Sequence, residues 1–279
     1  MSAQPTPPTV DELRPLVEAA ESLVGRSLER VREITGGPSG IDDHQVIAER
    51  IAYAATEART ARELLGTAEA SEGGLSALAG AGIAELVIRL RNRLEPLLDD
   101  LGLTEGDLEA AFPEPLRNAL RRLASESFVR EVGRAAIESR GQIEWPLDET
   151  LAQVRDAVRE FADAEIAPEA ERIHRNDDII PETFISKMGE LGYFGMSIPE
   201  QYDGFDMGML AMVLITEELS RASLAAAGSL ITRPEILAKA LLKGGTEEQR
   251  KHWLPKIAGG DLMVAISVTE PDIGSDCLL

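Results

Sequence analysis

The sequence predicts an all-α protein with one strand-like run close to its C-terminal end. Through most of the 279 residues, apolar side chains recur at three- and four-residue spacing, which is the pattern of amphipathic helices. Clusters of glycine and proline separate these stretches, as they do between helices. The short apolar run at residues 264–268 suits a buried strand and leads into the turn signal Glu-Pro-Asp.

The first part of the chain reads as a helical region over residues 10–145, preceded by a proline-rich lead-in at residues 1–9 that we expect to be disordered. The apolar spacing predicts its helices at 10–35, about 42–65, about 75–101, about 104–111 and about 113–140. We expect the Gly-Gly-Pro-Ser-Gly segment to end the first helix, and Asp42 or Asp43 to cap the second.

A change of sequence character at Trp145-Pro146 marks a predicted domain boundary, and residues 147–261 then form a second helical domain. Its helices are predicted at 151–166, 184–191, 207–226, 232–243 and after Thr246. Ala167-Pro168 is expected to stop the first of these. Pro234 suits a first helical position, which would place Arg233 at or near the N-cap.

The composition excludes several classes of function. Twenty-eight basic against 49 acidic residues give a formal charge of −21, which argues against binding to nucleic acid or to an anionic membrane. No apolar run approaches the roughly 20 residues that span a bilayer, and no signal peptide is evident. The single cysteine, Cys277, fits the cytoplasm. His44 and His174 have no neighbours with metal-ligand spacing, so no metal site is expected.

The segment Val-Ala-Ile-Ser-Val-Thr-Glu-Pro-Asp-Ile-Gly-Ser-Asp at residues 264–276 is the most informative motif. It combines an apolar run, a turn and a Gly-Ser pair where backbone can approach a ligand closely. It closely resembles the T-E-P-x-x-G-S-D signature of the acyl-CoA dehydrogenase family, with every fixed letter present. The alternative is an ordinary strand and turn.

Two further segments extend the resemblance over about 147–279. Residues 193–205 are similar to the family's L-G-x-x-G-x-x-I-P-E-x-Y-G-G run, except that Asp203 replaces a usual glycine, and residues 244–255 are similar to its G-T/S-E-E-Q run. The resemblance implies a helical N-terminal domain over residues 147–261, followed at residues 262–279 by the first strand of a truncated middle β-domain. The helical extension and the Ser-Leu-Ile-Thr-Arg-Pro-Glu segment resemble the methylsuccinyl-CoA dehydrogenase branch.

The resemblance also implies a chemistry. Family members use FAD to accept a hydride from the β-carbon of an acyl-CoA while a glutamate removes the α-proton, and they pass electrons to an electron-transfer flavoprotein. Carried over by position, the residues expected near the flavin are Ile266, Val268, Thr269, Gly274 and Ser275, with Ser275 also near the thioester. The catalytic base is expected beyond residue 279. A homo-oligomer is implied for the full-length enzyme. For Glu217 and Glu218 we expect packing or surface roles.

Arg233 is the expected substrate-selecting residue, because an arginine can hold the terminal carboxylate of methylsuccinyl-CoA with two parallel hydrogen bonds. Pairing of Arg233 with Glu235 or with another surface acid is the alternative. Two other interpretations stay open for the whole chain. One is a general short- or branched-chain acyl-CoA dehydrogenase, and the other is a helical module that binds a partner without catalysis.

Overall fold

The structure is a computed structural model that describes residues 6–143, 145–267 and 269–274. Within these ranges it is all-α, as predicted, and contains no strand. The chain divides into two compact units, Met1–Pro146 and Leu147–Leu279, and the division falls directly after the Trp145-Pro146 pair. No helix among the described residues is long and apolar enough to cross a membrane.

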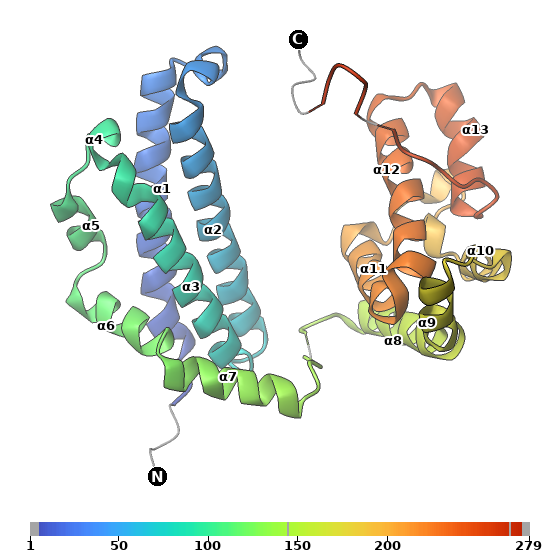
Figure 1. Cartoon of the computed structure of the whole chain (residues 1–279), viewed down its shortest axis with the longest axis horizontal. Helices are drawn as coiled ribbons and strands as arrows, with labels where there is room; N and C mark the ends of the chain where they lie inside the picture. The colour runs from blue at the N-terminus through green and yellow to red at the C-terminus, as the bar shows by residue number, and fades with distance from the viewer. Residues whose placement is uncertain (1–5, 144, 268, 275–279) are drawn as a thin grey trace. The chain divides into compact units, whose positions relative to one another are not determined.

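Three long helices form the core of the first unit: α1 (Val10–Thr35), α2 (Gln45–Ala70) and α3 (Ser76–Leu94). Figure 1 shows them lying alongside one another. Each one buries a leucine- and alanine-rich stripe in a common core, including Leu16 of α1, Leu65 of α2 and Leu90 of α3. Buried alanines on α2 allow this close approach. Close helix packing therefore fills the core although only 4% of the residues are aromatic.

Side-chain caps set the start of α1, but not that of α2. Thr9 accepts from the Glu12 amide while the Glu12 side chain accepts from the Thr9 amide, which closes a capping box. The predicted cap of α2 by Asp42 or Asp43 is wrong. Both residues lie in the 3-10 turn η2 (Asp42–His44), and α2 begins at Gln45 without a side-chain cap. This turn already orders the backbone ahead of the helix, so no aspartate reaches its amides.

Two of the predicted helices of the first unit are broken in the structure. The stretch at 75–101 becomes α3, the 3-10 turn η3 (Glu95–Leu97) and a short α4 (Leu98–Leu101), because Pro96 cannot donate within a continuous helix. The stretch at 113–140 becomes α6 (Glu114–Leu123) and α7 (Glu126–Glu138), because Ser125 caps a new helix start. The predicted helix between them is confirmed as α5 (Glu105–Ala111).

The second unit begins with helix that continues where a stop was expected. α8 (Glu149–Phe161) passes through the π-turn η4 (Ala162–Ile166) into α9 (Ala167–Asn176). The predicted stop at Ala167-Pro168 is wrong, because Pro168 falls in the first turn of α9, where its missing N–H costs little.

A tight loop follows α10 (Glu182–Glu190), with the 3-10 turns η5 (Tyr193–Gly195) and η6 (Glu200–Tyr202). Asp203 has φ 62°, the left-handed conformation that glycine and aspartate tolerate best, so it can stand where a glycine is usual. Gly204 cannot be replaced as easily, because a Cβ there would lie 2.0 Å from the Ile198 carbonyl oxygen.

The last helices are α11 (Gly208–Ser223), the π-turn η7 (Leu224–Gly228), α12 (Ser229–Gly244) and α13 (Glu247–Ala258). Ser223 accepts from the Ala226 amide and so caps the start of η7, which leads directly into α12. This helical run therefore starts upstream of residue 232, where the sequence predicted it. Pro234 is therefore inside α12, and the prediction that Arg233 is an N-cap is wrong. Thr246 is confirmed as the cap of α13 and forms a capping box with Gln249.

Candidate functional site

The segment expected to contact the flavin leaves the helical core at a pair of glycines. α13 ends at Gly259, and Gly260 follows with φ 77°. A Cβ on Gly260 would lie 3.1 Å from the Gly189 Cα and 3.0 Å from the Phe194 ring, so this close approach suits a residue without a side chain. The Leu262 amide then donates to the Lys256 carbonyl, which fixes the direction of departure.

The described residues of this segment are assigned neither helix nor strand, so the strand predicted at residues 264–268 is not formed in the part of the tail that the structure describes. Strands need a hydrogen-bonded neighbour, and the described residues provide none. Of the five expected flavin contacts, three are described and two, Val268 and Ser275, lie outside the described residues.

The turn in the signature is formed. The Glu270 amide donates to the Ile273 carbonyl at 2.9 Å, and this bond brings the chain around between Thr269 and Gly274. Among the described residues, a Cβ on Gly274 would meet only the Thr269 methyl, at 3.8 Å, so the described part of the chain leaves this backbone open to an approaching group. Ile266 is 41% exposed, and Thr269 is also exposed.

Arg233, the expected substrate contact, lies on the second turn of α12 with its side chain exposed. The alternative that it pairs with Glu235 is wrong. Glu235 instead accepts a hydrogen bond from Ser197 and pairs with Lys239. Within the described part of the chain, Arg233 has no hydrogen bond or ion pair. Its guanidinium is therefore free to meet an anion, although not at a helix N-terminus.

A groove runs between α11 and α12, with a volume of about 490 Å³. Its apolar lining includes Met209, Met212 and Val213 of α11 and Ile236 of α12. We call it the α11–α12 groove. Its volume lies within the roughly 300–1,000 Å³ range of small-molecule sites. The sequence analysis did not predict this groove, because apolar residues at three- and four-residue spacing on a helix are equally typical of a buried core.

Glu235 is the least expected residue at this groove. The residue is only 9% exposed, and its Oε1 atom makes no hydrogen bond among the described residues. Ser197 Oγ donates to the other oxygen, Oε2, in a short hydrogen bond. The Oε1 atom lies 3.6 Å from Lys239 Nζ, so it takes part in an ion pair although it accepts no hydrogen bond.

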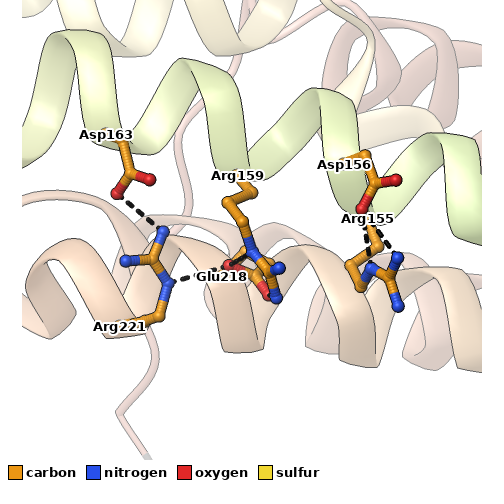
Figure 2. A network of polar contacts seen from close by, with 6 residues as sticks. All are labelled: Arg155, Asp156, Arg159, Asp163, Glu218 and Arg221. Atoms are coloured by element: carbon orange, nitrogen blue, oxygen red, sulfur yellow. Dashed lines mark hydrogen bonds and ion pairs between the residues drawn. The ribbon is translucent and has the colours of Figure 1, made fainter. Parts of the chain in front are cut away.

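Glu218 has a different role from its neighbour Glu217. Its side chain is 5% exposed, and it holds α8 against α11 (Figure 2). Arg159 donates from Nε and Nη2 to Glu218 at 3.0 and 2.5 Å, and Arg221 donates from Nε at 2.9 Å. Arg221 also donates to Asp163 at 2.7 Å, which extends the network into η4.

The network determines the charge of Glu218. Burial acts to raise the pKa of its carboxyl, but the hydrogen bonds and charges of Arg159 and Arg221 together outweigh burial and hold the pKa below its ordinary value. A carboxylate that stays ionised and hydrogen-bonded on both oxygens is a poor general base. Glu218 is therefore a structural residue, and Glu217 remains exposed beside the α11–α12 groove.

The family model that matches this chain covers most of the second unit. Residues 148–261 match the family model for the acyl-CoA dehydrogenase N-terminal domain. The chain is 43% identical over 144 residues to a (2S)-methylsuccinyl-CoA dehydrogenase of Cereibacter sphaeroides, a match that covers 52% of this chain and 25% of that protein.

Two plant relatives show the same partial overlap. A mitochondrial 2-methylacyl-CoA dehydrogenase of Solanum tuberosum is 37% identical over 131 residues, which is 47% of this chain and 32% of the relative. A mitochondrial isovaleryl-CoA dehydrogenase of the same plant is 35% identical over 130 residues, which is 46% and 32%. The chain thus spans about a quarter to a third of the length of these relatives. Residues 148–261 of this chain are therefore similar to the N-terminal domain of acyl-CoA dehydrogenases.

Proposed function

We propose that this chain is the N-terminal part of an FAD-dependent acyl-CoA dehydrogenase that oxidises a short branched acyl-CoA, methylsuccinyl-CoA in the first instance, to its 2-enoyl-CoA. The observation that carries the proposal is the 144-residue match at 43% identity to a (2S)-methylsuccinyl-CoA dehydrogenase. The complete Thr-Glu-Pro…Gly-Ser-Asp signature supports the same reaction. Electrons would pass to an electron-transfer flavoprotein, and the complete enzyme would be a homo-oligomer.

The described residues of the signature segment fit a flavin. The Thr269 side chain is exposed and has no hydrogen bond among the described residues, so its hydroxyl can donate to a ring edge. Exposed Ile266 offers an apolar wall, and the open backbone at Gly274 can approach a phosphate or a thioester. Val268 and Ser275 would complete the contact. When bound, FAD would supply the hydride acceptor that the protein itself lacks.

Arg233 would select the substrate. A carboxylate at the far end of the acyl group would pair with its free guanidinium, whereas an uncharged branched chain would gain nothing from it. The branched acyl-CoA relatives support a second candidate, a dehydrogenase of 2-methylacyl-CoA or isovaleryl-CoA. The two candidates differ in whether the substrate carries this carboxylate.

The experiment compares methylsuccinyl-CoA with 2-methylbutyryl-CoA in the protein made from the complete reading frame, with an artificial electron acceptor. We expect methylsuccinyl-CoA to be preferred, and Arg233→Met to lower kcat/KM for it by about 100-fold, the scale of a lost ion pair. The same variant should leave kcat/KM for 2-methylbutyryl-CoA unchanged. A preference for 2-methylbutyryl-CoA would overturn the assignment of methylsuccinyl-CoA as the substrate. Equal losses of kcat/KM for both substrates would overturn the role of Arg233.

The 279-residue chain alone is expected to show no turnover, since a positioned base contributes about 10²–10⁴-fold and we expect it elsewhere. Activity of the isolated chain above the background without protein would contradict this expectation. Titration of the chain with FAD, followed by absorbance, tests the flavin contacts separately from catalysis.

A further inference from the structure

We propose that Lys256 is a site at which acyl thioesters modify this chain, and that His252 acts as the base for this acyl transfer. The proposal goes beyond the dehydrogenase reaction and does not depend on it, because it concerns an exposed cluster on α13. Two observations carry it. In the described part of the chain, Lys256 alone among the lysines has an imidazole beside its amine, and the exposed Trp253 ring lies against both groups.

The lysines of the chain are few, so they can be compared one by one. There are five of them: Lys187, Lys239, Lys243, Lys251 and Lys256. Three are paired with a carboxylate. These pairs are Lys187–Glu165 at 2.7 Å, Lys239–Glu235 at 3.6 Å and Lys251–Glu247 at 3.6 Å. Lys243 is exposed and has no hydrogen bond or ion pair among the described residues.

These surroundings decide how well each amine can attack a thioester. The attack needs the lone pair of the neutral amine, because an ammonium group has three hydrogens and no lone pair. A carboxylate beside the amine favours the ammonium form, and it is too weak a base to take the proton efficiently near neutral pH. Lys243 avoids such a partner, but it also has no base beside it. These four lysines therefore set the background rate for the chain.

Lys256 has different surroundings. Its Nζ atom lies 3.3 Å from Nε2 of His252, which is four residues earlier on α13 and therefore on the same face. No ion pair joins this amine to a carboxylate among the described residues. A neutral imidazole accepts a hydrogen bond at one ring nitrogen. Histidine is also the side chain whose protonation ordinarily changes closest to neutral pH, which makes it the most frequent general base in proteins.

Trp253 holds the two groups in place. Its ring meets the His252 imidazole edge to face, with centroids 4.5 Å apart, and the Lys256 amine lies 5.4 Å from the centre of the same ring. Leu254 and Ile257 are buried on the opposite side of α13, so the cluster faces away from the core. Trp253 is 38% exposed and offers a short acyl chain an apolar surface beside the amine.

The proposed reaction is an acyl transfer in which nothing is oxidised or reduced. The Lys256 ammonium first loses one proton to water. The neutral nitrogen then attacks the carbonyl carbon of the thioester, so that a C–N bond forms and the C–S bond breaks. His252 Nε2 takes the second proton from the nitrogen and returns it to the departing thiolate. The products are an amide on Lys256 and a free thiol, and α13 loses one positive charge.

The experiment follows the acetylation of the full 279-residue chain by acetyl-CoA. Mass spectrometry measures the extent of acetylation at each lysine over time, and fragment spectra distinguish Lys251 from Lys256. We expect Lys256 to react about tenfold faster than Lys243. This is less than the 10²–10⁴-fold that a base contributes in an enzyme active site, because the cluster is exposed to water. The three lysines that are paired with carboxylates should react no faster than Lys243.

Three variants test the role of each neighbour. His252→Gln keeps a polar side chain but removes the base, so it should lower the rate at Lys256 to that of Lys243 and leave Lys243 unchanged. His174→Gln is the matched control, since it replaces an exposed histidine on α9 and should change no lysine. Glu165→Gln removes the carboxylate beside Lys187 and should raise the rate there by about two- to fivefold, the scale of a surface ion pair.

Two results would each overturn the proposal. The first is an equal rate at Lys256 and Lys243 in the unsubstituted chain, a comparison that needs no variant to fold. The second is an unchanged rate at Lys256 in His252→Gln with the circular dichroism signal of the parent. A fall of the rate at Lys243 together with that at Lys256 in this variant would show a change of the whole chain, and it would also remove His252 as the base.

Discussion

Replacing Glu218 with glutamine should destabilise the second unit by about 2–3 kcal/mol. The Glu218 side chain is 5% exposed and accepts three hydrogen bonds from Arg159 and Arg221. Removing one partner of a fully buried ion pair costs about 3–5 kcal/mol. Here both guanidinium groups keep more than a third of their surface, so water recovers part of that loss. The new amide NH₂ would also face the arginine donors.

The measurement is urea unfolding followed by the fluorescence of Trp253, in chains that all carry Trp145→Phe so that a single tryptophan reports on the second unit. The control is Glu169→Gln, which breaks the exposed pair with Arg172 and should cost less than about 1 kcal/mol. A Glu218→Gln variant within 0.5 kcal/mol of the parent would refute the structural role of this carboxylate, with the limit set by the scale of ordinary surface substitutions.

The same network predicts a pH dependence. Because Arg159 and Arg221 keep the pKa of Glu218 below its ordinary value in the folded chain, the stabilisation is complete above the unfolded-state pKa of about 4.3. It is lost as the pH falls from there through the folded-state pKa. The stability difference between the parent and Glu218→Gln should therefore be constant at neutral pH and should shrink below about pH 4. A difference that is unchanged in acid would contradict this assignment.

Three further outcomes are expected. Gly228→Ala should destabilise the second unit by about 1–3 kcal/mol in the same unfolding assay, because its Cβ would lie 2.1 Å from Ser220 Oγ; unchanged stability would show that η7 can shift. Limited proteolysis should cleave near residues 140–150 and leave two resistant pieces, and one protected piece that spans the junction would count against separate folding. Deleting residues 262–279 should raise solubility by light scattering and keep the helical circular dichroism signal, and a large loss of that signal would show that the tail supports the fold.

Much of the helical architecture could be predicted from sequence because it depends on local signals. The apolar spacing of residues 10–35 and the Thr246 cap both describe interactions within one helix, and both are confirmed. Prolines were harder to interpret. Pro168 and Pro234 each suggested a helix boundary, yet each lies within or at the start of a longer helical run. In both places a π-turn upstream changes the helix register, and no local pattern announces such a turn.

The candidate site divides in the same way. The sequence by itself determined the family signature at residues 264–276, because these residues are contiguous and their order is the signal. Only the tertiary structure decided the roles of the three glutamates near α11 and α12. Glu217, Glu218 and Glu235 look equivalent in sequence, but Glu217 is exposed, Glu218 joins two arginines, and Glu235 is buried against Ser197 and Lys239. Their environments come from residues far along the chain: Arg159 lies 59 positions from Glu218, and Ser197 lies 38 positions from Glu235. A carboxylate's charge and partners depend on what folding brings beside it.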